Sequence, residues 1–105
     1  MVIFIKMRII TPKQHFFELV RKWKDETGGY STSYHKYKNK NYQQIIGMGI
    51  KVVPYIFECM QKDSDFWHHA LVQILGENPI PNKAHGNLGL VCKLWLIWGK
   101  QKGLI

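Results

Sequence analysis

The chain has 105 residues, of which 46% are hydrophobic, a share that is ordinary for a globular protein and too high for a disordered tail. Lysine and arginine number 15 against 7 aspartates and glutamates, so the formal net charge is +8. Length and composition therefore indicate one basic domain over residues 1–105 and exclude a disordered chain.

The sequence lacks the motifs of the common metal, nucleotide and catalytic sites. Cys59 and Cys92 each lie in a hydrophobic run, where an isolated cysteine is typically a small buried side chain, and two cysteines do not make a disulfide framework. No Cys-x-x-Cys or His-x-x-x-His pair predicts a metal site. No glycine-rich phosphate loop, serine elbow or paired-carboxylate motif predicts catalysis. We therefore expect no enzymatic activity, no metal and no cofactor.

The first ten residues, MVIFIKMRII, form an apolar N-terminal extension. It is too short for a membrane span, which needs about twenty apolar residues, and Lys6 and Arg8 interrupt it. It is also followed by no small-residue cleavage site of a signal peptide. We therefore expect a cytoplasmic protein in which residues 2–10 form a short strand or an extended arm. Met7 is an alternative start.

Four later segments show the apolar periodicity of helices that pack on a common core. The four sets are Phe16, Leu19, Val20 and Trp23; Val53, Ile56, Phe57 and Met60; Trp67, Ala70, Leu71 and Ile74; and Val91, Leu94, Trp95 and Trp98. No strand-like alternation follows residue 10. With a short helix around residues 42–46, the pattern predicts an all-α fold, a bundle of about five helices.

The first helix is predicted over residues 12–27. Thr11 is followed by a proline and lies three residues before Gln14, which is the pattern of a capping box with proline at the first helical position. Gly28 and Gly29 are expected to end this helix, because glycine readily adopts the left-handed conformation of a C-cap.

Three loops are expected between the helices. Residues 28–40 are polar, aromatic and basic, residues 47–49 form a tight Gly-Met-Gly break, and residues 76–87 hold two prolines and two glycines. Pro54 falls in the first turn of the helix after residues 47–49, where its missing N–H costs nothing.

Further capping residues predict the ends of the last two long helices. Residues 63–64, Asp-Ser, precede the helix that Gly76 ends. Asn87 is expected to cap the final helix, which runs toward Gly99 or Gly103.

The centre of the chain combines Ile-Ile-Gly-Met-Gly, then Val53-Pro54, an acidic turn from Asp63 to Asp65, and Ala-Leu in the next helix. In these features, residues 42–75 resemble a HEAT-like helical unit. Such units normally need neighbours that bury both faces. The resemblance therefore implies that the flanking helices act as caps.

Three motifs extend the similarity: Phe-x-x-Leu-x-x-x-Trp-x-x-Glu-Thr from Phe16 to Thr27, Ile-Ile-Gly-Met-Gly over residues 45–49, and Trp-x-x-Trp-Gly from Trp95 to Gly99. In these motifs the chain resembles a family of short, uncharacterised bacterial proteins with a HEAT-like helical hairpin. The resemblance covers about residues 16–103. It implies a fold and no catalytic residues.

The segment from Tyr34 to Lys40 is the most suggestive for binding, because basic and aromatic residues alternate in it. Lysines neutralise phosphates and tyrosines stack on unpaired bases. The candidate nucleic-acid-binding residues are Tyr34, Lys36, Tyr37, Lys38 and Lys40. A solvated lysine-rich loop is the competing interpretation.

The candidates for binding a protein partner are Trp98, Tyr34 and Tyr37. The tryptophans lie on apolar stripes and are expected in the core, but Trp98 lies near the end of its helix, where an exposed indole can anchor a partner. His68 and His69 are adjacent and point about 100° apart on a helix, so they do not chelate one metal from one face.

Two functions follow as predictions. The first is a small helical protein-interaction module, an adaptor, inhibitor or subunit of a larger assembly. The alternative is a basic nucleic-acid-binding protein that uses the 34–40 segment. An enzyme is a third, which would require a pocket that holds His68 or His69 against Glu58 or Asp63. An acidic protein partner and a nucleic acid would both need the same lysines, so charge alone does not separate the first two.

Overall fold

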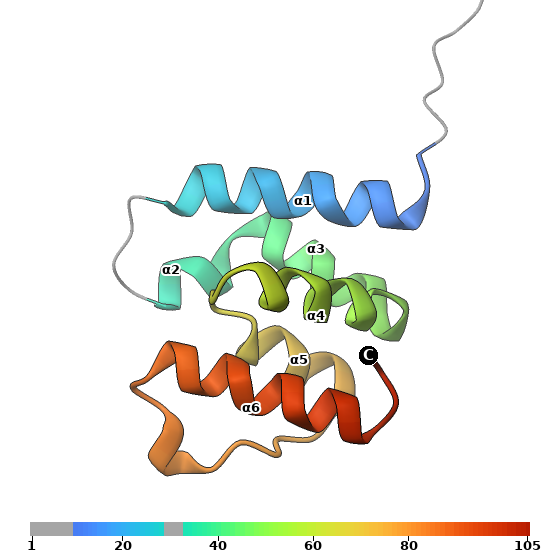
Figure 1. The fold of residues 1–105 in the computed structure, drawn as a ribbon. Helices are drawn as coiled ribbons and strands as arrows, with labels where there is room; N and C mark the ends of the chain where they lie inside the picture. Colours follow the sequence, from blue (N-terminus) through green and yellow to red (C-terminus); the bar gives the residue numbers. More distant parts are fainter. Residues whose placement is uncertain (1–9, 29–32) are drawn as a thin grey trace, which may run out of the picture.

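The computed structural model describes residues 10–28 and 33–105 and shows an all-α bundle (Figure 1). The expected strand or arm over residues 2–10 lies outside these residues except for Ile10, which has no regular structure. The elements are α1 (Pro12–Thr27), α2 (Ser33–Lys38), α3 (Lys40–Met48), the 3₁₀ turn η1 (Gly49–Val52), α4 (Val53–Lys62), α5 (His68–Leu75), the 3₁₀ turn η2 (Asn82–Ala84) and α6 (Leu88–Gln101). The five expected helices are confirmed, and α2 is an addition.

The start of α1 is confirmed in detail, as is its end at Thr27 before Gly28, but the conformation of the cap differs from the prediction; Gly29 lies outside the described residues. Thr11 Oγ1 accepts from the backbone N–H of Gln14 at 3.1 Å, and the Gln14 side chain accepts from the backbone N–H of Thr11 at 2.9 Å. Gly28 is right-handed, with φ of −61°, so a left-handed cap at this residue is wrong. Thr27 Oγ1 donates to the carbonyl of Trp23, four residues earlier, at 2.7 Å, so the buried hydroxyl of the last helical residue has its partner within the helix.

The prediction of a loop over residues 28–40 is wrong for its second half, where α2 forms. The segment has too few apolar residues to show helical periodicity, and packing decides its structure instead. The indole Nε1 of Trp23 donates to the carbonyl of Lys36 at 3.0 Å. Tyr37 stacks on His69 with ring centroids 4.6 Å apart. These two contacts hold α2 against α1 and α5.

The break at residues 47–49 is narrower than expected. Gly47 and Met48 belong to α3, and Gly49, the first residue of η1, has a left-handed φ of +78°. Pro54 lies in the first turn of α4, as predicted. The chain therefore turns at a single glycine, which allows α3 to be longer than its apolar pattern indicated.

The helix after the acidic turn begins later than residues 63–64 suggest. It starts at His68, and its N-cap residue, Trp67, makes no side-chain cap hydrogen bond. The end of α5 at left-handed Gly76 is confirmed, as is the cap of α6, in which Asn87 Oδ1 accepts from the N–H of Leu90 at 3.0 Å. The last helix ends at Gln101, two residues before left-handed Gly103.

One hydrophobic core joins all the helices except α2, which lies against its margin through Tyr37. α1 packs on α3, α3 packs on α5, and both α4 and α5 contact α6, so that α1 and α6 lie on opposite sides of the bundle (Figure 1).

Both cysteines are free and buried, as predicted. The apolar sets of α1 and α4 are completely buried, whereas Ile74, Leu94 and Trp98 are half-buried. None of the helices in the described part of the chain has the length and apolar character that crossing a bilayer requires.

Candidate functional site

The predicted binding residues of the 34–40 segment divide into an outer and an inner group. Tyr34 is 62% exposed, and the Nζ atom of Lys38 lies 5.5 Å from the centre of its ring. Lys40, at the start of α3, is also exposed. The fold therefore presents an exposed tyrosine and two exposed lysines near the junction of α2 and α3.

Lys36 and Tyr37 face the protein instead. The Nζ atom of Lys36 lies 3.6 Å from Asp65 Oδ1, 5.2 Å from the ring centre of Trp23 and 5.7 Å from that of Phe66. Tyr37 is half-buried and stacked on His69. The structure thus engages both side chains in internal packing, and their predicted roles in binding would require them to leave these contacts.

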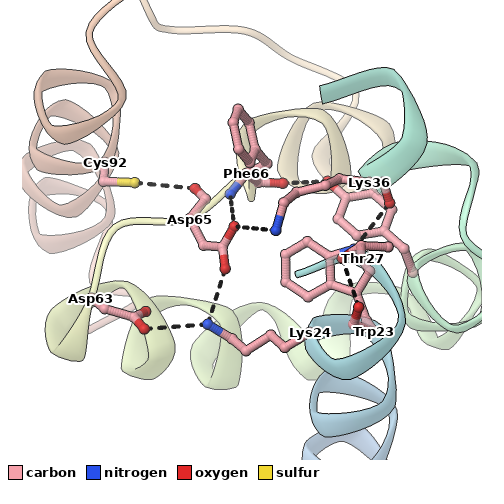
Figure 2. Close-up of polar contacts among 9 residues, drawn as sticks. Trp23, Lys24, Thr27, Lys36, Asp63, Asp65, Phe66 and Cys92 are labelled. Carbon is pink, nitrogen blue, oxygen red and sulfur yellow. Dashed lines mark hydrogen bonds and ion pairs between the residues drawn. The ribbon is translucent and has the colours of Figure 1, made fainter. Parts of the chain in front are cut away.

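Asp65 is the centre of the polar network that holds this corner together (Figure 2). Its carboxylate accepts from Lys24 Nζ at 3.0 Å and from the backbone N–H of Phe66 at 2.8 Å, besides the ion pair with Lys36. Its carbonyl accepts from the thiol of Cys92 at 3.4 Å. The nearly buried carboxylate of Asp65 therefore links α1, α2 and the α4–α5 connection. The backbone carbonyl of the same residue links them to α6.

Lys24 bridges two acids of the same turn, with its Nζ atom 3.2 Å from Asp63 Oδ2. Burial by itself lowers the pKa of Lys24, but the hydrogen bonds and charges of Asp65 and Asp63 outweigh it, so the pKa is raised above 10.5. This ammonium group is charged at every physiological pH and is already neutralised inside the molecule.

Most of the acids are used in the same way, as partners of cations within the molecule. The ion pairs are Glu58 with Lys13, Asp25 with Arg21, Glu18 with Lys22, Asp63 and Asp65 with Lys24, and Asp65 with Lys36. Every cation among them comes from α1 or α2. Residues 76–105 hold four lysines, Lys83, Lys93, Lys100 and Lys102, against the single acid Glu77.

A shallow groove lies between the end of α4, the outer face of α6 and the C-terminus. Its volume is about 330 Å³. The residues that line it, called the α6 groove below, are Gln61, Lys93, Leu96, Ile97, Lys100 and Ile105. Ile97 and Ile105 are 46% and 49% exposed, and Leu90 continues the apolar surface along α6.

The spacing along α6 explains why these residues share one face. Leu90, Lys93, Ile97 and Lys100 follow one another at intervals of three, four and three residues, which places them in one row on a helix. Sequence reasoning missed this row because α6 is apolar on several sides, and the buried row with Val91 and Trp95 was the stronger signal. Neither lysine of the groove makes an ion pair within the part of the chain that the structure describes.

Trp98, the predicted anchor for a partner, lies at the margin of the core. It is half-buried and meets Trp95 edge-to-face with ring centroids 5.4 Å apart. Lys102 Nζ lies 5.9 Å from the centre of its ring. Part of the indole is therefore accessible, next to the α6 groove in sequence but about 100° around the helix from Ile97.

His68 and His69 also divide into separate environments. His68 Nδ1 accepts from the indole N–H of Trp95 at 3.0 Å, whereas His69 stacks on Tyr37. The acids that an enzymatic site would place beside them, Glu58 and Asp63, are paired with Lys13 and Lys24. Among the described residues, no group of three His, Cys, Asp or Glu side chains is arranged to hold a metal ion.

The two thiols are protonated at neutral pH. Burial raises the pKa of Cys59 to about 11, and burial also raises the pKa of Cys92. A thiol in this state is a poor nucleophile and a poor metal ligand.

No protein-family model, curated protein or solved structure matches the chain.

Proposed function

We propose that this protein is a small helical protein-interaction module, an adaptor, inhibitor or subunit of a larger assembly, and that it binds its partner through the α6 groove. The observation that supports this most directly is the row of exposed aliphatic and unpaired basic side chains on α6. Ile97 and Ile105 are the apolar centre, and Lys93 and Lys100 flank them.

The chemistry of the groove selects one kind of partner, an amphipathic helix with an apolar row flanked by carboxylates. An apolar row on one helix packs in a groove of this form through side chains at intervals of three and four residues. Because the lysines of the groove have no internal partner, glutamates or aspartates of an incoming helix would complement them. The +8 net charge strengthens the same preference at long range.

The size of the groove indicates a modest affinity. Burying the exposed parts of Leu90, Ile97 and Ile105 contributes on the order of 3 kcal/mol. The lysines mainly increase the association rate and the selectivity for acidic partners. We therefore propose a weak, reversible complex unless the partner also contacts Trp98 or the 34–40 segment.

The proposal includes a cytoplasmic location and no catalytic activity or cofactor. Two free, buried cysteines support a reducing compartment, because such compartments keep thiols unpaired. The pairing of Glu58 and Asp63 with lysines of α1 supports the absence of an acid–base site around the histidines.

A synthetic helical peptide of about 18 residues tests the groove directly. The probe has leucines along one face and glutamates on both flanks, and its control has lysines in place of the glutamates. We expect the acidic peptide to bind at least about tenfold more tightly than the basic one by fluorescence anisotropy. Exchanging both groove lysines, Lys93→Glu with Lys100→Glu, should reverse this preference.

Two exposed isoleucines provide a matched pair of variants. Ile97→Asp should weaken binding of the acidic peptide at least about tenfold, because it places a charge in the apolar centre of the groove. Ile50→Asp should leave it unchanged, because Ile50 is 62% exposed, lies in η1 and is not one of the residues that line the groove. Equal effects of the two variants, or equal binding of both peptides, would show that the groove is not the site.

Nucleic-acid binding is the second candidate function, and the exposed group at the junction of α2 and α3 supports it. Tyr34, Lys38 and Lys40 give one aromatic ring and two cations on an accessible surface. A single-stranded nucleic acid matches this combination, since bases stack on tyrosine and phosphates pair with lysine. Binding through this group should weaken as salt rises, because lysines that pair with phosphates release counterions.

A further inference from the structure

A second cavity, of about 410 Å³, lies on a different side of α6 from the groove. Side chains from α2, the α4–α5 connection, the start of α5, the loop before α6 and α6 itself converge on it. The lining includes Tyr37, Phe66, His68, His85, Leu88 and Val91, and we call this cavity the histidine pocket. Its volume lies within the range of small-molecule sites.

The hydrogen bond from Trp95 determines the protonation state of His68. An indole N–H can only donate, so His68 Nδ1, 3.0 Å away, is the unprotonated acceptor. The neutral ring then carries its hydrogen on Nε2. Burial, together with the neighbouring His85 and His69, lowers the pKa of His68, so this tautomer persists at neutral pH. His68, which lines the pocket, therefore has its one N–H donor on Nε2.

The remaining walls are formed by aromatic rings and aliphatic side chains. The imidazole of His85 meets that of His68 edge-to-face with centroids 4.6 Å apart, and Tyr37 and Phe66 add two rings with centroids 6.4 Å apart. Leu88 and Val91 close the side formed by α6. Among the described residues that line the pocket, none is a carboxylate, a lysine or an arginine.

From these walls we infer that the histidine pocket binds a neutral, planar aromatic molecule of one or two rings that carries a hydrogen-bond acceptor, such as an aryl carboxamide or a cyclic amide. The aromatic side chains contact the ring, and His68 Nε2–H donates to the acceptor. A charged ligand would lose its hydration without gaining an ion pair, which disfavours it. A hydrocarbon ring would leave the donor unpaired.

This site is independent of the proposed interaction module. The histidine pocket and the α6 groove share no lining residue. Ligand at the pocket perturbs Leu88 and Val91, whereas a peptide at the groove perturbs Lys93 and Ile97. Failure of one proposal is therefore distinguishable from failure of the other in a residue-resolved experiment.

The test is a titration of the full chain, labelled with ¹⁵N, with three probes of similar shape at neutral pH. Benzamide is neutral and has a hydrogen-bond acceptor. Benzoate has an acceptor but carries a negative charge, and ethylbenzene is neutral but has no acceptor. We expect saturable shifts for benzamide at the backbone amides of His68, His85 and Leu88 and at the indole N–H of Trp95. Its affinity should exceed those of benzoate and ethylbenzene at least about tenfold.

Two substitution pairs assign the binding to the pocket. Leu88→Trp fills it and should abolish the benzamide shifts, whereas Leu90→Trp, two residues along the same helix and facing solvent, should not. His85→Ala removes an exposed pocket wall without disturbing the core and should weaken binding, and His15→Ala on α1 should not. Shifts that survive Leu88→Trp, or equal affinity for benzoate or ethylbenzene, would overturn the proposal. Unsaturated, scattered shifts up to the solubility of benzamide would overturn it as well.

Discussion

Lys36 of α2 and Asp65 of the α4–α5 connection form an ion pair at 3.6 Å, with both side chains nearly buried (Figure 2). The pair fastens α2, the helix that local sequence patterns do not predict. Lys38, two residues later, points to solvent beside Tyr34. Two lysines of one short helix therefore have different physical roles.

Lys36→Ala is expected to lower the free energy of unfolding by about 1–2 kcal/mol, because it removes one of two cations from a nearly buried carboxylate. Lys24 remains beside Asp65 and limits the loss. Urea unfolding followed by circular dichroism measures the change. Lys38→Ala is the matched control, with an effect within about 0.5 kcal/mol. A similar loss in both variants would mean that general charge, and not the Asp65 network, controls stability.

Gly99 lets α6 approach α4 closely, so Gly99→Ala should destabilise the fold. A Cβ atom there would lie 2.9 Å from Phe57 Cζ, and Phe57 is completely buried. Overpacking costs about 1–3 kcal/mol, which exceeds the gain of about 1 kcal/mol in helix propensity.

Gly47→Ala is the matched substitution and should have the opposite sign. Gly47 lies in α3 with no atom within 4 Å of an added Cβ. Only the helix propensity then changes, and we expect a gain of about 0.5–1 kcal/mol. Thermal unfolding distinguishes the two variants, since about 1 kcal/mol shifts Tm by about 4–8 °C in a domain of this size. Stabilisation by both alanines would contradict the close approach of α6 and α4.

His68 makes stability depend on pH. Its pKa is lowered because burial disfavours the charged ring, and because His85 and His69 add positive charge nearby. Below its ordinary pKa of 6.5, the unfolded chain binds the proton more readily than the folded one. The contribution of His68 is therefore complete above that pH and is lost as the pH falls through the lower pKa of the folded state.

The measurement is Tm between about pH 7.5 and about pH 5 for the parent chain and two variants. Tm should fall on acidification, and the fall should be smaller in His68→Gln, whose amide oxygen can still accept from Trp95. His15→Gln, on α1, should retain the parent pH dependence. An unchanged pH dependence in His68→Gln would show that other groups cause it.

The nucleic-acid candidate predicts a defined change in salt dependence. If Lys38 and Lys40 each neutralise a phosphate of single-stranded nucleic acid, replacing both with alanine should reduce the slope of log K against log salt concentration by about 1.4. Because both side chains are exposed, the fold should be unaffected. Anisotropy with a labelled oligonucleotide measures the slope. The same slope before and after the substitutions would exclude these lysines as phosphate contacts.

Local and periodic features of the fold could be predicted because they depend on neighbouring residues. The capping box of Thr11 and Gln14 needs only an interval of three residues and forms as predicted. The apolar set of α4 needs only helical periodicity and is completely buried. The cap at Gly76 needs only a glycine at the end of the helix, and this glycine adopts the left-handed conformation that was predicted.

Features that depend on distant residues could not be predicted in this way. The Trp23 indole holds α2 by donating to the carbonyl of Lys36, and Asp63, which the prediction placed at the start of α5, instead pairs with Lys24 of α1. The orientation of Lys36 follows from the same network. None of these partners lies within the segment whose structure it decides.

The sequence by itself thus determined an all-α chain with helices at known places, since periodicity and capping are properties of the chain alone. Only the tertiary structure decided which sides of α6 are covered. This helix is apolar on several sides, so its pattern is compatible with more than one buried face. Packing against α4 and α5 buries Val91 and Trp95 and leaves Ile97 exposed between two lysines. The α6 groove exists because the core covers only one side of α6 and the other side remains exposed to solvent.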